Sequence, residues 1–467
     1  MNTTRIKAHA WEIKIAKLYL FFLPFRMVTP FLFLKDIIGP LAISFDLIFH
    51  VWGLFLWFTN NKGISIGASN LSLFNTVKNS ILYLNLSSLI MAFVMYSIYG
   101  DHNGESPFSA ILPMILFYFQ YLFIFLYNIR VFSIVRYRDM ISIFDKLCIV
   151  LLSIAFVQVA VMNGIGGAIY DVFASIVGGF NKSADLPKLC LTMSEGAGAG
   201  CVMGVFIFPY LLSRVLNGSR SAGRQLLLWL IPLYYTHSST AMILFAVGVL
   251  FTVYRILFIN NSIEGRKFIW NFFGYAILAV IALSVLSASG IIKSDVFDSI
   301  NYLLFQKATD GSNGSAVSRT VTLAYNWGCF TEMPIMGVGN GLQGYFFNKY
   351  FPISAFYVEG SDVGAFYEIA QTGIANGDSF LPGYFSGYGI IGLVVLFNLV
   401  SRLRSQYRSR RYNLGIFGDM FLIGSICFIP MAIQGEAYSL YFAWFVLSIP
   451  FMFFSQDEIN EFHNKTK

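Results

Sequence analysis

The feature of this chain that most limits its fold is a succession of apolar runs, each about as long as a membrane is thick. A hydrocarbon core about 30 Å thick calls for roughly 20 apolar residues in one helix. Lipid offers the backbone no hydrogen-bond partner, so each run is expected to be helical. The chain is therefore predicted to be an all-α polytopic integral membrane protein. About twelve transmembrane helices are expected, at 18–34, 38–58, 81–99, 109–128, 147–163, 199–216, 225–236, 240–258, 268–289, 381–399, 416–433 and 439–454.

Composition supports this class. Of 467 residues, 57% are hydrophobic and only 12% are charged, which is more apolar surface than a soluble core can bury. The N-terminal segment 1–17 leads into the first apolar run without a small-residue cleavage site. We therefore expect that run to stay in the membrane as an anchor.

Lysine and arginine predict the orientation, because basic residues beside the spans tend to be held in the cytoplasm. If both termini are cytoplasmic, the inner loops and tails carry 23 basic residues and the outer loops carry 7. The strongest inner anchor is the segment 401–411, SRLRSQYRSRR. The net charge of +7 is then explained by topology, so no nucleic-acid partner is expected.

Two outer segments interrupt the pattern of span and short turn. Residues 164–198 are glycine-broken and suit a re-entrant or interfacial helix. Residues 290–380 form a long outer loop, and a loop of that length without spans is more often functional than passive. Three parts are thus predicted: nine helices with the re-entrant segment in 1–289, the large loop in 290–380, and three helices with a cytoplasmic tail in 381–467.

The large loop is expected to contain a helix from Arg319 to about Thr331, then a turn in MPIMGVGNG, residues 333–341, and a second helix at 362–372. The GVGNG run lacks the preceding strand and following helix of a dinucleotide fingerprint. Its glycines indicate a tight turn with positive backbone dihedrals. No DxD or HExxH motif is present, so neither a metal nor a cofactor is expected.

The five cysteines show no CxxC spacing. We interpret them as small apolar residues in or near the spans. A disulfide joining Cys190 to Cys201 or to Cys329 is the alternative.

Several local motifs follow one another in a telling order. They are MSEGAGAG at 193–200, YYTHSSTAMILF at 234–245, the serine–arginine pair opening 318–341, and NGDSFLPGYFSGYGIIGL at 376–393. In their order and placement they resemble the O-antigen and capsule repeat-unit polymerases of the O-antigen ligase/polymerase superfamily. The resemblance extends over most of the chain in architecture.

This resemblance implies a bacterial inner-membrane glycosyltransferase. Such an enzyme moves a growing glycan from undecaprenyl diphosphate to the non-reducing end of another carrier-linked repeat unit, at the periplasmic face. It also implies a separate co-polymerase partner that regulates chain length. The related lipid A ligases usually place a histidine where the large loop returns to the membrane. Here Asp378 and Ser379 stand at that position, which favours the polymerase branch.

The chemistry of the transfer points to cations first. Charge develops on the leaving diphosphate, and an arginine fork stabilises it through bidentate hydrogen bonds. Arg319 is the only arginine on the outer side of the predicted topology, although it could instead be a solvated loop residue. Arg26 lies within the first predicted span, where a charge is functional by default unless it snorkels to a headgroup.

The acceptor hydroxyl needs a carboxylate as base. Asp378 lies where the large loop re-enters the membrane, Glu195 lies just before the sixth span, and Glu436 lies in the short turn before the last span. The predicted topology brings all three to the face that carries Arg319. Each has a plain alternative: helix capping for Asp378 and Glu195, and a solvated turn for Glu436.

Other polar and aromatic residues of the same face are candidates for binding sugar or diphosphate. His237 with its neighbouring hydroxyls makes an outer turn, for which helix capping and interhelical bonding are the alternative. Sugar rings could stack on Tyr325, Trp327, Tyr345 and Tyr384. The candidate substrate-binding set is Arg26, Ser318, His237, Ser238, Ser239, Tyr325, Asn340, Ser379 and Tyr384.

Two other functions stay open at this point. One is the ligase branch, which passes the finished glycan to a lipid core or a protein. The other is a flippase for lipid-linked oligosaccharide, for which we expect paired halves and charged midplane residues. The sequence does not predict the sugars, the linkage or the oligomeric state.

Overall fold

The computed structural model describes most of the chain. Described are residues 8–25, 45–176, 181–186, 188–193, 196–260, 266–267, 270, 274, 302, 314–351, 374, 380–434 and 441–466, with the backbone alone for 185, 260, 314–320, 434 and 463–466. This part is almost entirely helical, and its only extended pairing is an isolated bridge between His102 and Glu105. The predicted all-α class is confirmed for the described residues.

Seven helices in the described part are long and apolar enough to cross a membrane. Each overlaps one of the predicted spans. They are Ala68–Tyr99, Pro107–Ile134, Tyr137–Met162, Gly196–Leu216, Ser239–Ile259, Phe380–Asn413 and Ile416–Ile433. Helical class and membrane character therefore agree with the sequence, whereas the number twelve remains a prediction.

The other five predicted spans do not correspond to any of these seven helices. The last, 439–454, contains a shorter apolar helix, α21 (Tyr441–Ser448), and 225–236 holds the short helices α10 (Arg220–Leu228) and α11 (Leu230–Tyr235). The second overlaps α3 (Phe45–Asn60), and most of 268–289 lies outside the described residues.

The first helix begins earlier than the predicted first span at 18–34. It is α1 (Ala10–Phe22), and residues 26–44 lie outside the description. The start of this helix contains Glu12, Lys14 and Lys17, so it was not predicted as part of an apolar run. In the structure Glu12 is neutralised by an arginine from another helix, so its charge does not prevent burial.

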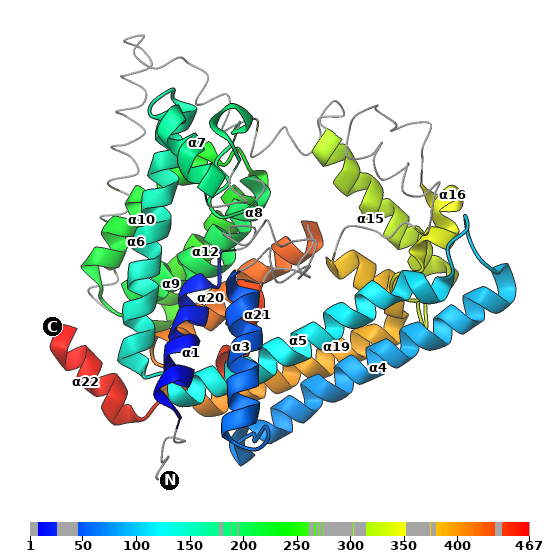
Figure 1. Cartoon of the computed structure of the whole chain (residues 1–467), viewed down its shortest axis with the longest axis horizontal. Coiled ribbons are helices and arrows are strands. Elements are labelled where there is room, and N and C mark those ends of the chain that lie inside the picture. Colours follow the sequence, from blue (N-terminus) through cyan, green and yellow to red (C-terminus); the bar gives the residue numbers. More distant parts are fainter. Residues whose placement is uncertain are drawn as a thin grey trace.

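The helices form two groups that can be followed in Figure 1. In one group α4 (Ala68–Tyr99), α5 (Pro107–Ile134) and α19 (Phe380–Arg410) run obliquely side by side, with α15 (Gly314–Glu332) and α16 (Phe347–Tyr350) at their far ends. With 32 residues, α4 is about 48 Å long at 1.5 Å per residue. Because this exceeds a hydrocarbon core of about 30 Å, α4 is long enough to carry the loop helices beyond the membrane.

The second group is packed around aromatic rings. It contains α6 (Tyr137–Met162), α12 (Ser239–Arg255), α20 (Ile416–Gln434), α21 and a helix made of α8 (Gly196–Cys201), a π-helical turn and α9 (Phe208–Leu216). Phe144 meets Phe206, Phe417 and Phe445 edge to face, with ring centroids 5.2, 5.9 and 5.6 Å apart. Such contacts add to the apolar burial that holds the helices together.

The helix ends gather at two opposite ends of the bundle. At one end Asn70 bonds to the carbonyl of Phe451, and the Tyr137 hydroxyl accepts from the amide of Ile416. We name this the basic end, because Arg130, Arg136, Arg138, Arg214 and the arginines within the segment 402–411 lie near it. At the opposite end the Tyr345 hydroxyl donates to the carbonyl of Gly100, and the amide of Leu189 donates to the carbonyl of Tyr235. We name this the loop end; it holds the segments 100–107 and 235–239, the described parts of 163–193, and the loop 314–350.

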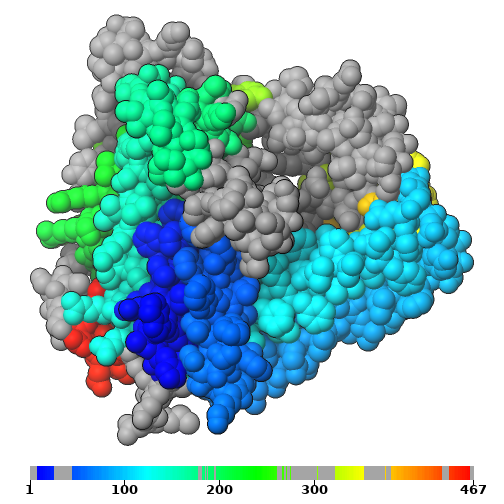
Figure 2. Space-filling view, viewed as in Figure 1, coloured from blue at the N-terminus to red at the C-terminus, as the bar shows by residue number. Residues whose placement is uncertain are grey.

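Large apolar side chains cover the outside of the bundle. In Figure 2, α1, α3, α4 and α5 face the viewer as one surface. Phe55 and Phe58 of α3, and Leu86 and Phe93 of α4, are each more than half exposed. A surface this apolar indicates contact with lipid.

Candidate functional site

The segment 333–341, which we call the motif, inserts its backbone into a broken membrane helix. At Gly389 the backbone of α19 has φ 60° and ψ −153°, which interrupts the helix. A continuous helix would bond the amides of residues 390 and 391 to the carbonyls of 386 and 387. Instead the two amides donate to Pro334 and Ile335, at 2.8 and 3.1 Å, and the two carbonyls accept from Val338 and Gly339, at 2.9 and 3.0 Å.

This exchange explains why a polar, glycine-rich stretch lies beside a membrane helix. Unpaired backbone groups at membrane depth are costly, and the motif pairs all four of them. The motif glycines Gly337, Gly339 and Gly341 have positive φ values of 74°, 93° and 96°, so the predicted tight turn is confirmed. A Cβ on Gly337 would lie 2.3 Å from the backbone of Gly387 and Tyr388, which leaves room for glycine alone.

A buried polar cluster lies under the motif. Gln343 donates to the carbonyl of Gly383 at 3.1 Å and to the hydroxyl of Ser386 at 3.2 Å, and accepts from the amide of Gly341 at 3.0 Å. Ser386 in turn donates to Oδ1 of Asn326, on α15, at 2.8 Å. The cluster thus ties α15, the motif and the first part of α19 into one unit.

A second layer joins this unit to α4 and α5. Ser88 donates to the Tyr388 hydroxyl at 3.2 Å, and Tyr118 and Asn340 lie beside the same hydroxyl. Asn85, one turn from Ser88, is buried with neither amide atom hydrogen-bonded within the described residues. These residues make a polar seam where the loop meets the membrane helices.

Within the described side chains, one carboxylate of the loop is already paired. Glu332, the last residue of α15, accepts from Lys349 and from the Tyr350 hydroxyl. These bonds hold the pKa of Glu332 below its usual range, so the carboxylate is ionised at neutral pH. Glu332 is not among the candidates predicted from the sequence.

The candidate arginine of the loop lies on α15. The backbone of Ser318 and Arg319 is helical, in agreement with the predicted helix, and their side chains lie outside the description. Helix α15 packs along α19, so the described structure attaches this part of the loop to the membrane helices.

The remaining candidate charges, Arg26, Glu195, Asp378 and Glu436, lie outside the described residues, and so does Ser379. Their described neighbours nevertheless make informative contacts at the loop end. Pro24 accepts from the Thr192 hydroxyl, which joins the segments before Arg26 and before Glu195.

Phe380, two residues after Asp378, packs against Phe428 and Trp444, with ring centroids 6.1 and 5.8 Å apart. Phe428 belongs to α20 and Trp444 to α21, the helices before and after the segment 435–440 that contains Glu436. The described neighbours of the candidate charges therefore make two sets of contacts. The segment before Arg26 meets the segment before Glu195. The residue two positions after Asp378 meets the helices on either side of Glu436.

The turn at His237 is a cap. His237 has a positive φ of 46°, and the Ser238 hydroxyl accepts from the amide of Ala241 at 3.3 Å, which caps α12. Ser239 is the first residue of that helix and is half-buried. The capping alternative is what the described contacts show for Ser238.

The last glycine of MSEGAGAG and a glycine of the π-helical turn that follows have a packing role. A Cβ on Gly200 would lie 2.7 Å from Cβ of Ala241, and one on Gly204 would lie 2.4 Å from Cβ of Leu244. They therefore let this helix approach α12 closely. The carbonyl of Tyr235 also accepts from Leu189 at 2.8 Å, which fixes the segment before the glycines against the His237 turn.

The candidate stacking aromatics have different surroundings. Tyr325 is fully buried against Phe347 and Phe351, and Tyr384 is buried with its hydroxyl bonded to the carbonyl of Gly392. Neither ring faces solvent in this structure. Trp327, by contrast, is 68% exposed, and Tyr345 bonds to the carbonyl of Gly100 while half-buried.

A second buried polar cluster lies between α1, α3 and α5, and the sequence analysis missed it. Arg130 donates to Glu12 at 2.6 Å, and both side chains are 1% exposed. His50 and Tyr127 pack beside Tyr19, whose hydroxyl donates to Asn128 at 3.0 Å. The sequence offered one signal for this buried ion pair: Glu12 lies just before the first predicted span and Arg130 lies just after the fourth.

No group of three or more His, Cys, Asp or Glu in the described part could hold a metal. All five cysteines are free, so the structure contains no disulfide of the kind left open above. Comparison of the chain with family models, with curated proteins and with solved structures finds no match in any of the three.

Proposed function

We propose that this protein is a membrane glycosyltransferase that polymerises lipid-linked polysaccharide repeat units. The observation that carries the proposal is the insertion of the motif into the broken helix α19. Broken helices with irregular backbone at membrane depth are characteristic of sites that bind polar or charged substrates. The order of the local motifs, which resembles that of the repeat-unit polymerases, supports the same function.

In the proposed reaction, a hydroxyl oxygen at the non-reducing end of one carrier-linked unit attacks the anomeric carbon of another. The bond from that carbon to the diphosphate oxygen breaks, and undecaprenyl diphosphate leaves with the electron pair. Arg319 would stabilise the charge on the diphosphate, with Arg26 as the second cation. Asp378, Glu195 or Glu436 would accept the hydroxyl proton and pass it to water.

The proposed location is the bacterial inner membrane, with the basic end in the cytoplasm and the loop end in the periplasm. The arginines of the basic end support this orientation. Undecaprenyl-linked substrates and a chain-length-regulating co-polymerase are the proposed partners.

The test is product analysis by mass spectrometry, with purified protein in lipid and the undecaprenyl-diphosphate repeat unit as the sole substrate. Lipid-linked oligomers that grow by one repeat are the expected result. If glycan moved only to an added lipid A core or peptide, the protein would be a ligase. No new glycosidic bond with any acceptor would contradict both enzyme functions.

Arg319→Ala is expected to lower the rate of polymerisation at least about a hundredfold. Charge-assisted bonds of this kind contribute roughly 1.5 to 3 kcal/mol each, and a fork makes two. The matched control is Lys349→Ala, which removes a loop cation already paired with Glu332 and should leave the rate within about twofold. Equal rates for the two variants would remove Arg319 from the mechanism.

Asp378→Asn and Glu195→Gln are each expected to slow the reaction, with a base contributing about 10²-fold or more. Oligomer ladders at fixed times measure the effect. Normal rates in both variants would transfer the role of base to another group.

Transport of lipid-linked oligosaccharide is the second candidate. The buried cluster of Glu12, Arg130 and His50 favours it, because ionisable residues inside a membrane bundle mark transport pathways as well as catalytic sites. A transporter would move the fluorescently labelled substrate across a vesicle membrane without forming a bond, so the product analysis separates the two functions.

A further inference from the structure

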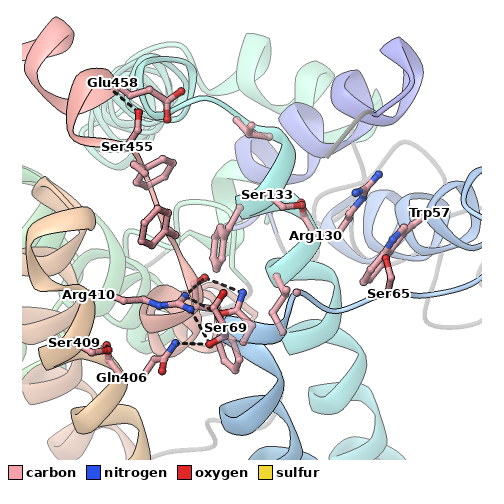
Figure 3. Close-up of a pocket in the computed structure, with 18 residues that line it drawn as sticks. Trp57, Ser65, Ser69, Arg130, Ser133, Gln406, Ser409, Arg410, Ser455 and Glu458 are labelled. Carbon is pink, nitrogen blue, oxygen red and sulfur yellow. Dashed lines mark hydrogen bonds between the residues drawn. The ribbon is translucent and has the colours of Figure 1, made fainter. Parts of the chain in front are cut away.

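A cavity of about 830 Å³ opens at the basic end, away from the motif. Its walls come from the last turns of α3, α5 and α19, the start of α4, and the segment 451–458 (Figure 3). Phe132, Phe451 and Phe454 give it an apolar side, and the serines and arginines of the other elements give it a polar one. The cavity is therefore amphipathic.

Arg410 is the main charge in this cavity, and it is 6% exposed. Its guanidinium donates to Oδ1 of Asn70 at 2.6 Å and to the carbonyls of Ser69, Phe451 and Met452 at 2.8, 2.9 and 3.3 Å. All four acceptors are neutral. No carboxylate in the described part of the chain pairs with it, so its positive charge is hydrogen-bonded without being neutralised.

Two further side chains line the cavity away from Arg410. Among the described residues Nη2 of Arg130 and Nε1 of Trp57 are buried without a partner, whereas the charge of Arg130 is already paired with Glu12. Figure 3 shows Glu458, the acidic lining residue, beside Ser455 at another edge, away from Arg410. Burying the charge of Arg410 without a counter-charge costs free energy, which an anion in the cavity would offset.

The surroundings indicate how such an anion arrives. Phe58, Ile64 and Leu71 are exposed apolar side chains that neighbour lining residues in the sequence, and the lining residue Phe453 is exposed as well. A molecule with a phosphate group and an acyl chain would meet apolar surface outside and cationic donors inside. We propose that this cavity binds the phosphate of an anionic lipid headgroup. The site lies at the opposite end from the motif and does not depend on the polymerase function.

The experiment measures binding of phosphatidylglycerol to the full-length protein by native mass spectrometry in a neutral detergent. Arg410 ties α4, α19 and the segment 450–452 together, so replacing it could unfold the protein. Ser409→Asp is sharper, because Ser409 is exposed, lines the cavity and leaves every bond of Arg410 in place. The matched control is Ser405→Asp, which adds the same charge one helical turn away, outside the lining.

Phosphatidylglycerol is expected to bind more tightly than phosphatidylcholine, and Ser409→Asp should weaken it about tenfold through charge repulsion at close range. Ser405→Asp should change it no more than about twofold, because an exposed charge farther away is screened. If excess inorganic phosphate displaces the lipid, the site recognises the phosphate group alone. If it does not, the site recognises the headgroup together with the acyl chains. Equal affinity for both lipids, or equal effects of the two variants, would overturn the proposal.

Discussion

Glu12→Gln is expected to destabilise the protein by about 3 to 5 kcal/mol, the cost of breaking a fully buried ion pair by removing one partner. The partner left behind is Arg130, which is 1% exposed and donates to Glu12 at 2.6 Å. A guanidinium does not lose its proton in proteins, so the buried charge cannot be neutralised by titration. Denaturant titration in mixed micelles measures the free energy of unfolding.

The control comes from the same helix. Lys17 pairs with Asp139 at 2.9 Å, with side chains 39% and 37% exposed, so Lys17→Gln should cost less than about 1 kcal/mol. The double variant Glu12→Gln with Arg130→Met should recover much of the lost stability, because it removes the uncompensated charge. A loss as small as that of Lys17→Gln would show that the pair does not stabilise the fold.

Gly337→Ala is the second change with a large expected effect, roughly 3 kcal/mol or more. Alanine at a φ of 74° is strained, and its Cβ would lie 2.3 Å from the backbone of α19. The motif would have to move, and the four hydrogen bonds that complete the broken helix would be lost. Unfolding in mixed micelles measures stability, and oligomer ladders measure the proposed activity.

Gly104→Ala is the control that separates backbone strain from steric overlap with a neighbouring helix. Gly104 has a φ of 80° and open space around its Cα, so alanine there costs about 1 kcal/mol from the backbone alone. Matching losses in the two variants would mean that the motif is free to shift and is not locked into α19.

Much of the candidate site follows from local pattern. The tight turn of the motif was predictable because alternating glycines signal positive φ, and the helix from Arg319 was predictable from its polar and apolar spacing. What the motif contacts was not predictable. Its partner is the interior of α19, about fifty residues later in the chain, and hydrogen bonds between backbones leave no mark on side-chain pattern.

The aromatic residues show the same limit. Tyr325 and Trp327 are two residues apart on one helix, yet the first is fully buried and the second is 68% exposed. Sequence alone treated both as candidates to stack on sugar. Which face of α15 packs against α16 decides the difference.

The sequence by itself determined that this chain is helical, with helices long and apolar enough to cross a membrane, because apolar runs of membrane length have few other stable structures in lipid. It also indicated where most long helices lie and which end is basic. Only the tertiary structure decided that Glu12 is neutralised by Arg130 and that α19 is broken and repaired by the motif. It also decided that Arg410 is buried with no counter-charge among the described residues. These features depend on residues from distant parts of the chain meeting in space, and whether a buried charge or an unpaired backbone group is tolerated depends on the group that meets it.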